Sequence, residues 1–395
     1  MFNYICEREM DKIDLNGDIE EIDKKVEITL LEAAKQSISK SKGRMKRKAV
    51  PWWTDECSKI VKERNRALRL LRRTHNVQNL IRYKQEQARV RKIICKAKRQ
   101  SWQTFCNKIG RSTPVGEVWG MIRSMRGVRR EWQYPVLKMG EETAVSDEEK
   151  AEMLAKAFTQ IHSSDNLTEK GKRGREMTSL AHPGSLERRE NTNSAMDAPF
   201  TLEERKRAIT KSGLTSPGKD EICYVMLKHL GVSASRKLLA LYNKVWEVGK
   251  LPTGSKEAVI IPIRKPGKDP SNPMNYRPIA LTSHVGKIME RMITERLGFF
   301  MESRGILSPH QSGFRRGRET MDPVICLETK IKKPQVNEES VVAVFFDLEK
   351  AYDMVWKEGL MNKLNMMGIV GRAYNWIKDF LFDRFIQVRI GTALT

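Results

Sequence analysis

Apolar side chains recur at helical spacing through the first third of the chain, between mostly charged positions. Residues 19–38 mix acidic and apolar side chains at this spacing and predict one short helix. Over residues 51–130 the apolar positions continue, and Lys and Arg fill the other faces. We therefore expect an acidic helix and a basic tail at 1–50, followed by a basic helical region at 51–162.

The pattern changes twice after residue 162. Residues 163–198 are polar with few large apolar side chains, so they cannot bury enough surface to offset chain entropy, which predicts a disordered linker. From residue 199, helical and strand-like segments are mixed, which is typical of an α/β unit. The expected elements are a capping box at Thr201 and Glu204, helices at 225–248 (interrupted at Gly231), 284–303, 356–367 and 372–382, and strands at 256–263, 341–347 and 385–390.

Positive charge is concentrated in one block. The chain of 395 residues has a formal net charge of +24. Residues 41–130 contain 26 Lys and Arg against 5 Asp and Glu, a net charge of +21. Such a block can bind a polyanion through Coulomb attraction and counterion release. Two interpretations stay open: a nucleic-acid clamp, or a solvated helical hairpin whose tryptophans pin it to a neighbour.

Several classes of protein are disfavoured. The six cysteines form no C-x-x-C pair and no His stands at zinc-finger spacing, which argues against a zinc site. Their scatter predicts reduced thiols in a cytosolic or nuclear protein. The first residues lack a long apolar run, so we expect no secretory signal. No stretch reaches about 18 consecutive apolar residues, so we expect no membrane partner.

The main candidate for chemistry is the run FFDLEKAYD, which ends at Asp353. The apolar residues before it predict a central buried strand that ends in Asp347. A carboxylate there is costly unless it binds a cation or accepts good hydrogen bonds. Mg²⁺ prefers one or two carboxylates plus substrate phosphates, so Asp347 fits a magnesium ligand. The alternative is an ordinary cap on the following turn, and Asp353 fits a structural role better.

A second candidate lies in two cationic segments, VIIPIRKPGKDP from Val259 and NYRPIALTS from Asn275. A hairpin made of them could close over a triphosphate, which carries about four negative charges. Lys265 and Arg277 are the candidates for that contact, with Arg264 and Lys268 as alternatives to Lys265. A structural hydrogen bonder in a Pro-rich turn is the alternative for Arg277.

Two more segments complete the pattern, SPGKDEI from Ser216 and LSPHQSGFRRGRET from Leu307. In their order and spacing over residues 213–395, the four segments resemble the fingers and first palm motif of reverse transcriptases, in a form most similar to jockey-type LINE elements. The resemblance implies an α/β, partial right-hand polymerase at 199–395. The block after Trp52 and Trp53 resembles, less specifically, the connector between the endonuclease and polymerase domains of such elements.

The resemblance also implies residue roles. Asp347 would bind both ions of a two-Mg²⁺ site, with the Leu348 backbone beside them. Tyr352 would be the steric gate against a 2′-hydroxyl, with a core aromatic as the alternative. A segment near template and primer would contain Gln311, Gly313, Phe314 and Arg315. For Arg315, nucleic-acid contact and a solvated charge stay equally open.

The implied activity is RNA-directed DNA polymerisation, which adds dNTPs to a primer 3′-OH on an RNA template. The implied location is the nucleus or a cytoplasmic ribonucleoprotein. The sequence contains no Asp-Asp dipeptide, and the family's Pro-Gln-Gly loop and thumb are absent. We therefore expect a C-terminally truncated chain that is inactive by itself. The alternatives are a nucleic-acid-binding remnant whose basic region 41–130 is its working part, or the product of a decayed element that does not fold stably.

Overall fold

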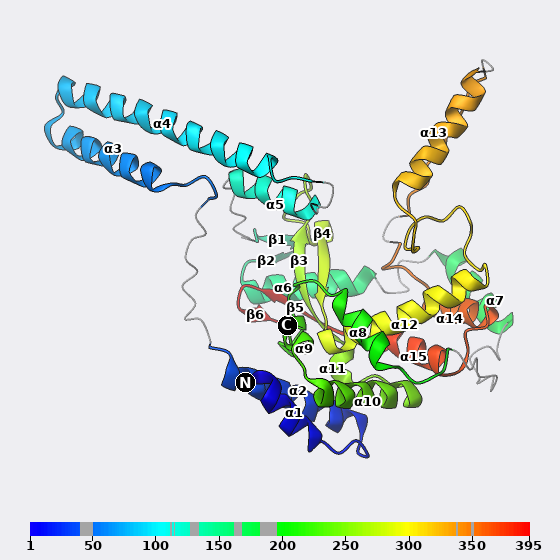
Figure 1. Ribbon diagram of the computed structural model, residues 1–395. Coiled ribbons are helices and arrows are strands. Elements are labelled where there is room, and N and C mark those ends of the chain that lie inside the picture. The colour runs from blue at the N-terminus through cyan, green and yellow to red at the C-terminus, as the bar shows by residue number, and fades with distance from the viewer. Residues whose placement is uncertain are drawn as a thin grey trace. The chain divides into compact units, whose positions relative to one another are not determined.

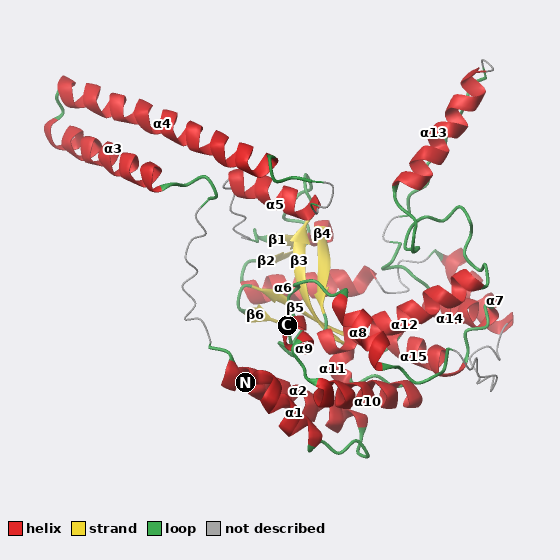
Figure 2. Ribbon diagram, in the orientation of Figure 1, coloured by secondary structure: helices red, strands yellow, loops and turns green. Residues whose placement is uncertain are grey.

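Among the residues that the structure describes, helices outnumber strands, and the strands form two small sheets (Figures 1 and 2). The computed structural model describes residues 1–39, 50–110, 113, 115–126, 134–161, 168–181, 196–336, 339–348 and 351–395. The chain divides into one unit of residues 1–40 and 134–395 and another of residues 41–133. The mixture of helices and sheet agrees with the expected α/β class. None of the described helices combines the length and the apolar character that a membrane span requires.

Residues 41–133 contain a long helical hairpin. Helices α3 (Asp55–Thr74) and α4 (Val77–Cys106) run antiparallel, and α5 (Val115–Arg126) follows them. The side chains of Thr54 and Asn76 accept hydrogen bonds from backbone N–H groups in the first turns of α3 and α4, which caps both helices. The long basic helices predicted here are therefore confirmed. The predicted end of the basic helical region at residue 162 is wrong, because residues 137–144 form two short strands and residues 134–161 belong to the larger unit. The residues buried between α3 and α4 are few and mostly small: Cys57, Ile60, Ala67, Val90 and Ala97.

The larger unit has a helical core to which the N-terminus contributes. Helix α2 (Ile19–Ser37) buries Ile22 and Leu30 in the same apolar cluster as Trp246 of α10 (Val232–Val248). Residues 1–39 thus share a core with residues far along the chain. The other helices of this core are α1 (Phe2–Asp11), α8 (Leu202–Thr210), α9 (Tyr224–Lys228), α12 (His284–Ser303), α14 (Lys357–Met366) and α15 (Gly371–Leu381).

A four-stranded sheet has the order β4-β3-β5-β6. Its strands are β3 (Glu257–Arg264), β4 (Tyr276–Leu281), β5 (Phe385–Ile390) and β6 (Ala393–Leu394). Strand β3 pairs antiparallel with β4 and parallel with β5, although more than a hundred residues separate β3 from β5. The predicted strands at 256–263 and 385–390 are therefore confirmed, and the structure shows that they are neighbours in one sheet.

A second apolar cluster joins this sheet to the segment before it. Helix α6 (Asp147–Ile161) buries Leu154 and Phe158 together with Ile260 and Val388 of the sheet. The short hairpin of β1 (Leu137–Met139) and β2 (Glu142–Ala144) packs into the same cluster. Through this packing one face of the β3–β4 hairpin is covered.

Helix α7 (Glu169–Ala181) lies within the segment predicted to be a disordered linker. Arg175 of α7 stacks over the Trp356 ring at 5.8 Å, and α7 contacts α14. The rest of the predicted linker, apart from residues 168 and 196–198, lies outside the described residues. The remaining helices of the larger unit are α11 (Thr253–Lys256), η2 (Pro273–Asn275) and α13 (Met321–Val336).

The predicted strand at 341–347 is wrong. These residues form no strand, and their large side chains lie in solvent, with 88% of Val342 and 91% of Phe346 exposed. A strand forms where a neighbouring strand accepts and donates its backbone hydrogen bonds. Among the described residues no strand pairs with 341–347, so its apolar side chains have no sheet in which to be buried.

Candidate functional site

The β3–β4 hairpin presents one open face. Arg277 stands opposite Ile263, and Ile279 opposite Ile261, so these four side chains share a face. The other face, which includes Ile260, belongs to the cluster around α6. On the open face Arg277 is exposed, and 43% of Ile279 is in contact with solvent. The hairpin therefore carries an arginine on a surface that a ligand can reach.

The connecting loop is held by its own hydrogen bonds. The Lys265 backbone N–H donates to the Asn275 carbonyl at 2.8 Å, and the Lys265 ammonium donates to the Met274 carbonyl at 3.2 Å. The Tyr276 hydroxyl donates to the Pro270 carbonyl at 2.7 Å. The structure thus places Lys265 and Arg277 on one hairpin, as the sequence predicted. Lys265 closes the loop, whereas the Arg277 side chain makes no hydrogen bond or ion pair with the described residues.

Arg315 has a structural partner that neither sequence interpretation included. Its guanidinium donates to both carboxylate oxygens of Glu302 at the end of α12, at 2.8 and 2.6 Å, and to the Ser308 carbonyl at 2.7 Å. The hydrogen bonds from Arg315 hold the pKa of Glu302 below its usual value. In this structure Arg315 therefore anchors the segment that contains Gln311, whose side-chain N–H donates to the Gly313 carbonyl at 3.1 Å.

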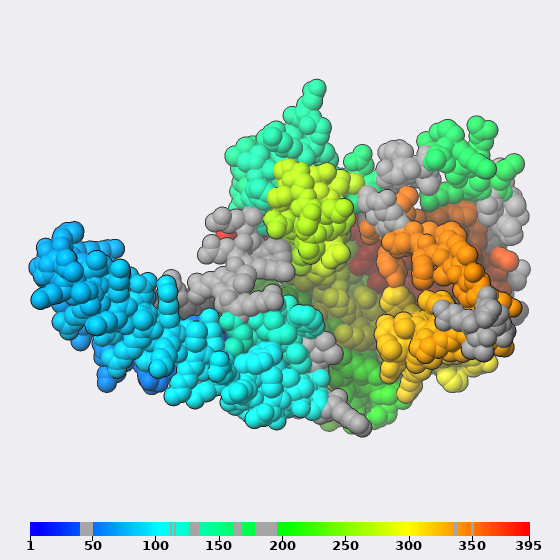
Figure 3. Space-filling view, turned by 90° about the horizontal axis from the view of Figure 1, so that it is seen from above, coloured from blue at the N-terminus to red at the C-terminus, as the bar shows by residue number. Residues whose placement is uncertain are grey.

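Phe314 and Tyr352 meet although the sequence places them in different motifs. Their ring centroids lie 6.2 Å apart with the ring planes at 84°, an edge-to-face pair. Phe314 has a φ of +61°, and 94% of it is exposed, so the backbone turns its ring outward. Because 75% of Tyr352 is also exposed, Tyr352 is not a core aromatic in this structure. Figure 3 shows a recess between the β3–β4 hairpin, in yellow-green, and the orange segment around α13.

Asp347 does not lie at the end of a buried strand. It is exposed in a segment without regular structure, and 76% of Leu348 after it is exposed. In the described part of the chain, no three His, Cys, Asp or Glu side chains converge in a way that could hold a metal ion. The residues present therefore do not fit the two-ion site that the resemblance implied. Glu349 and Lys350 lie outside the described residues.

Comparison with known proteins identifies one domain of the chain. A family model described as reverse transcriptase (RNA-dependent DNA polymerase) matches residues 263–393. Residues 263–393 are a reverse transcriptase domain. The chain is also 39% identical over 193 residues to the probable RNA-directed DNA polymerase from transposon BS of Drosophila melanogaster, covering 49% of this chain and 21% of that protein. It is 34% identical over 191 residues to the RNA-directed DNA polymerase from mobile element jockey of the same species, covering 48% and 21%.

The reverse transcriptase domain contains all the site residues that the sequence predicted. Lys265 and Arg277 lie near its start, Arg315 in its middle, and Asp347 and Tyr352 about two thirds of the way along it. The names of these relatives, RNA-directed DNA polymerases from transposon BS and from the mobile element jockey, agree with the jockey-type resemblance. The chain spans about a fifth of the length of these curated relatives.

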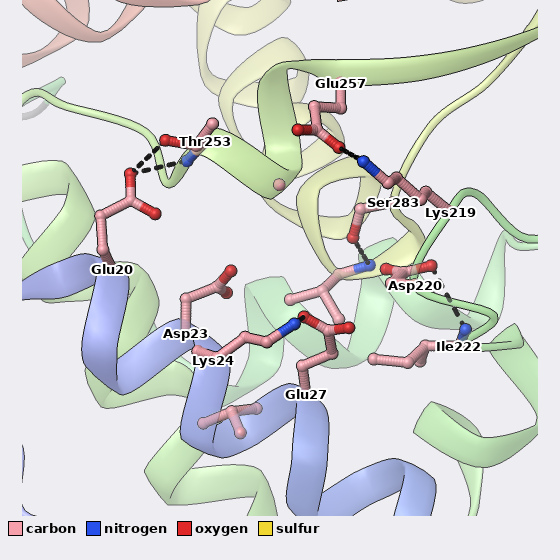
Figure 4. A pocket seen from close by; sticks show the side chains of 13 residues that line it. Glu20, Asp23, Lys24, Glu27, Lys219, Asp220, Ile222, Thr253, Glu257 and Ser283 are labelled. Carbon is pink, nitrogen blue, oxygen red and sulfur yellow. Dashed lines mark hydrogen bonds and ion pairs between the residues drawn. The ribbon is translucent and has the colours of Figure 1, made fainter. Parts of the chain in front are cut away.

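A cavity of about 350 Å³ lies between α2, the turn that contains Lys219 and Asp220, and the residues just before the reverse transcriptase domain (Figure 4). Glu20 accepts hydrogen bonds from the Thr253 backbone N–H and hydroxyl at 2.8 and 2.7 Å. Lys219 pairs with Glu257 at 2.7 Å. Besides these residues, the charged side chains that line the cavity are Asp23, Lys24 and Glu27.

Asp23 has the most perturbed carboxylate of this cavity. Burial first, and then the negative charges of Glu27, Glu20 and Asp220, raise the pKa of Asp23 to about 7. Burial also raises the pKa of Asp220, although the Ser283 hydroxyl and the Ile222 N–H donate to it. This cluster cannot be recognised from the sequence, because residues 19–37 have the pattern of an ordinary acidic helix and no local signal shows that the helix packs beside the turn at 219–222.

Proposed function

We propose that the chain supplies the fingers and the first palm motif of an RNA-directed DNA polymerase of a non-LTR retrotransposon, in a partial right-hand fold. The substrates would be an RNA template, a DNA primer and dNTPs. The observation that carries the proposal is the β3–β4 hairpin, which presents Arg277 on an open face within a domain of the reverse transcriptase family. Because the chain spans about a fifth of its relatives, the activity of the whole protein is part of the proposal.

Each site residue has a proposed role. Arg277, which has free guanidinium donors and lies on an open surface, pairs with the triphosphate of the incoming nucleotide. Lys265 adds positive charge at the loop and holds its shape. Tyr352 and Phe314 form an aromatic wall beside the nucleotide sugar, where Tyr352 discriminates against a 2′-hydroxyl. Gln311, Gly313 and Arg315 shape the segment next to template and primer.

Binding of a fluorescent dATP to the chain with a primer–template tests this assignment. Arg277→Gln should weaken dATP binding about ten- to hundredfold, because a charge-assisted pair contributes about 1.5–3 kcal/mol. Arg389→Gln removes an exposed arginine from β5 of the same sheet and should leave dATP binding unchanged. Equal effects of the two substitutions would mean that dATP binding depends only on the net charge of the chain, and that dATP does not bind at the hairpin.

The metal site is the incomplete part. Reverse transcriptases of this family generally depend on a divalent metal. We propose that Asp347 is the carboxylate that this chain contributes, and that the 395-residue chain by itself does not assemble the site. Purified chain with primer, RNA template, dNTPs and Mg²⁺ should therefore show no extension above background. Extension that Asp347→Asn abolishes would contradict this part of the proposal.

We further propose that the helical unit binds nucleic acid in its own right. One face of α4 carries five exposed cations at helical spacing: Arg82, Arg89, Lys92, Lys96 and Arg99. Binding should survive Asp347→Ala and weaken steeply with salt. The slope of log K against log salt concentration should become less steep by about 0.7–0.9 for each cation whose phosphate contact is removed. RNA binding that is insensitive to replacement of Arg89, Lys92 and Lys96 by Gln would place the contact elsewhere.

A further inference from the structure

Aromatic rings and cations gather at the open end of the α3–α4 hairpin. The Trp52 and Trp53 rings lie 5.7 Å apart, and the Lys98 ammonium stands 4.7 Å from the centroid of the Trp52 ring. The Trp52 indole N–H donates to the Met125 carbonyl of α5 at 3.3 Å. Trp52 therefore serves the packing of the unit, and Lys98 is held above it by a cation–π contact.

Two other tryptophans at this end leave part of their rings in water. Trp53 is 40% exposed and Trp102 is 37% exposed. The polar group of Trp53 already has a partner, since its indole N–H donates to the Ser58 hydroxyl at 2.8 Å. Trp102 lies 5.8 Å from the Phe105 ring. In both cases the structure fixes the ring and leaves apolar surface uncovered.

The surroundings of Trp102 are cationic. Lys98 and Arg99 precede it by four and three residues on α4, so they lie one turn away on the same side of the helix. Helix α4 as a whole has eight Lys and Arg against one acidic residue, Glu86. A partner for this surface must offer flat apolar groups and negative charge together, and nucleic acid with accessible base faces has both.

We propose that the aromatic–basic surface formed by Trp53, Lys98, Arg99 and Trp102 binds single-stranded nucleic acid. Bases stack on the two indoles, and the phosphates on either side pair with Lys98 and Arg99. A duplex cannot bind in this way, because its bases already stack on one another and show only their edges. The inference rests on the proposed nucleic-acid binding by this unit and adds which form of nucleic acid it takes.

The test compares single strands with a duplex on the full chain. Fluorescence anisotropy measures binding of a labelled 20-nucleotide RNA without secondary structure, a DNA of the same sequence, and the corresponding RNA duplex. Trp102→Ala and Trp53→Ala should each weaken binding of both single strands about tenfold, since stacking contributes about 1–3 kcal/mol per base. Duplex binding should change less than twofold. Equal losses for single strands and duplex, or no loss at all, would overturn the proposal.

Matched variants separate stacking from folding and from charge. Trp102→Phe keeps a ring and should retain most single-strand binding, whereas a purely structural role would make it as harmful as Trp102→Ala. Trp119→Ala removes a tryptophan that is 58% exposed on α5 outside this surface, and should have no effect. Lys98→Gln with Arg99→Gln should weaken all three probes and lower the salt slope. A loss of single-strand binding in the tryptophan variants would support the stacking proposal even if the chain had no polymerase activity. If the tryptophan variants showed no such loss, the stacking proposal would fail, but duplex binding through the other cations would still support nucleic-acid binding by this unit.

Discussion

Replacing Asp23 with asparagine should stabilise the packing of α2 at neutral pH. Asp23 lies between Glu20 and Glu27 on its own helix and faces the cavity that Asp220 also lines (Figure 4). Burial and these like charges raise its pKa from 3.8 to about 7. At about 1.4 kcal/mol per pH unit, the ionised side chain costs the folded unit about 4 kcal/mol above pH 7.

The direction of the pH effect follows from the raised pKa. The folded state binds the Asp23 proton more tightly than the unfolded chain does, so this contribution to stability is complete below pH 3.8 and is lost as the pH rises through about 7. Between pH 6 and pH 8 the loss amounts to about 1.4 kcal/mol, a factor of about ten. Asparagine has no proton to lose, so the variant should lack this part of the pH dependence. Lys24 opposes the effect, and its charge is present in both proteins.

Hydrogen exchange of the α2 peptide measures the effect locally. Protection factors, which correct for the intrinsic exchange rate, should fall about tenfold from pH 6 to pH 8 in the wild-type chain and stay constant in Asp23→Asn. Glu32→Gln removes an exposed acid from the same helix and should keep the wild-type behaviour. If Asp23→Asn still showed the tenfold fall, the explanation by the cavity carboxylates would be refuted.

Three further substitutions test how the larger unit is held together. Arg296→Met should lower the free energy of unfolding by about 3–5 kcal/mol in urea titrations, because it leaves the mostly buried Glu204 without its partner at 2.7 Å; a loss below 1 kcal/mol would contradict the burial of this pair. Burial raises the pKa of Glu204, but hydrogen bonds from Arg296 and Thr201 outweigh burial, so the pKa is lowered overall. The stabilisation by this pair should therefore persist at neutral pH and be lost only as the pH falls below 4.5. Asp197→Ala should cost about 1–2 kcal/mol and speed hydrogen exchange in α15, because Asp197 accepts hydrogen bonds from two N–H groups at the start of that helix; unchanged exchange would exclude the cap. Gly371→Ala should be more harmful, because φ is +65° there and an added Cβ would collide with the Asp197 carboxylate. Combination with Asp197→Ala should recover part of that loss and leave the φ strain.

Local signals in the sequence were sufficient for most elements. The Ser283 hydroxyl caps α12, which spans the predicted residues 284–303. The predicted interruption at Gly231 separates α9 from α10. The predicted capping box at Thr201 and Glu204 is present. Periodicity, caps and glycine act within a few residues, so one sequence is enough to find them.

Features that depend on distant residues were not predictable in this way. The apolar run at 341–347 was assigned to a buried strand from its composition, yet burial needs neighbouring strands that the described residues do not provide. The packing of α1 and α2 into the core, and with it the acidic cavity, depends on a partner helix some 200 residues away. The composition of a segment determines how much apolar surface it can bury, whereas the topology of the fold determines which other segments it contacts.

The candidate site was predicted in part. Lys265 and Arg277 stand on one hairpin because the antiparallel register of β3 and β4 follows from the two strands that flank the loop. The meeting of Phe314 with Tyr352 and the pairing of Arg315 with Glu302 were not foreseen. Both contacts depend on how the segment after α12 folds back, and charge or aromatic character along the sequence does not contain that information.

The polymerase proposal is tested most directly by primer extension with a chimera. Residues 1–395 would be joined to the segment that follows the matched region in the jockey polymerase of Drosophila melanogaster. We predict RNA-templated extension by the chimera, its loss with Asp347→Asn, and no effect of Asp383→Asn, which changes an exposed acid of the same domain. An active chimera that is indifferent to Asp347→Asn would contradict the central claim that this carboxylate belongs to the polymerase site.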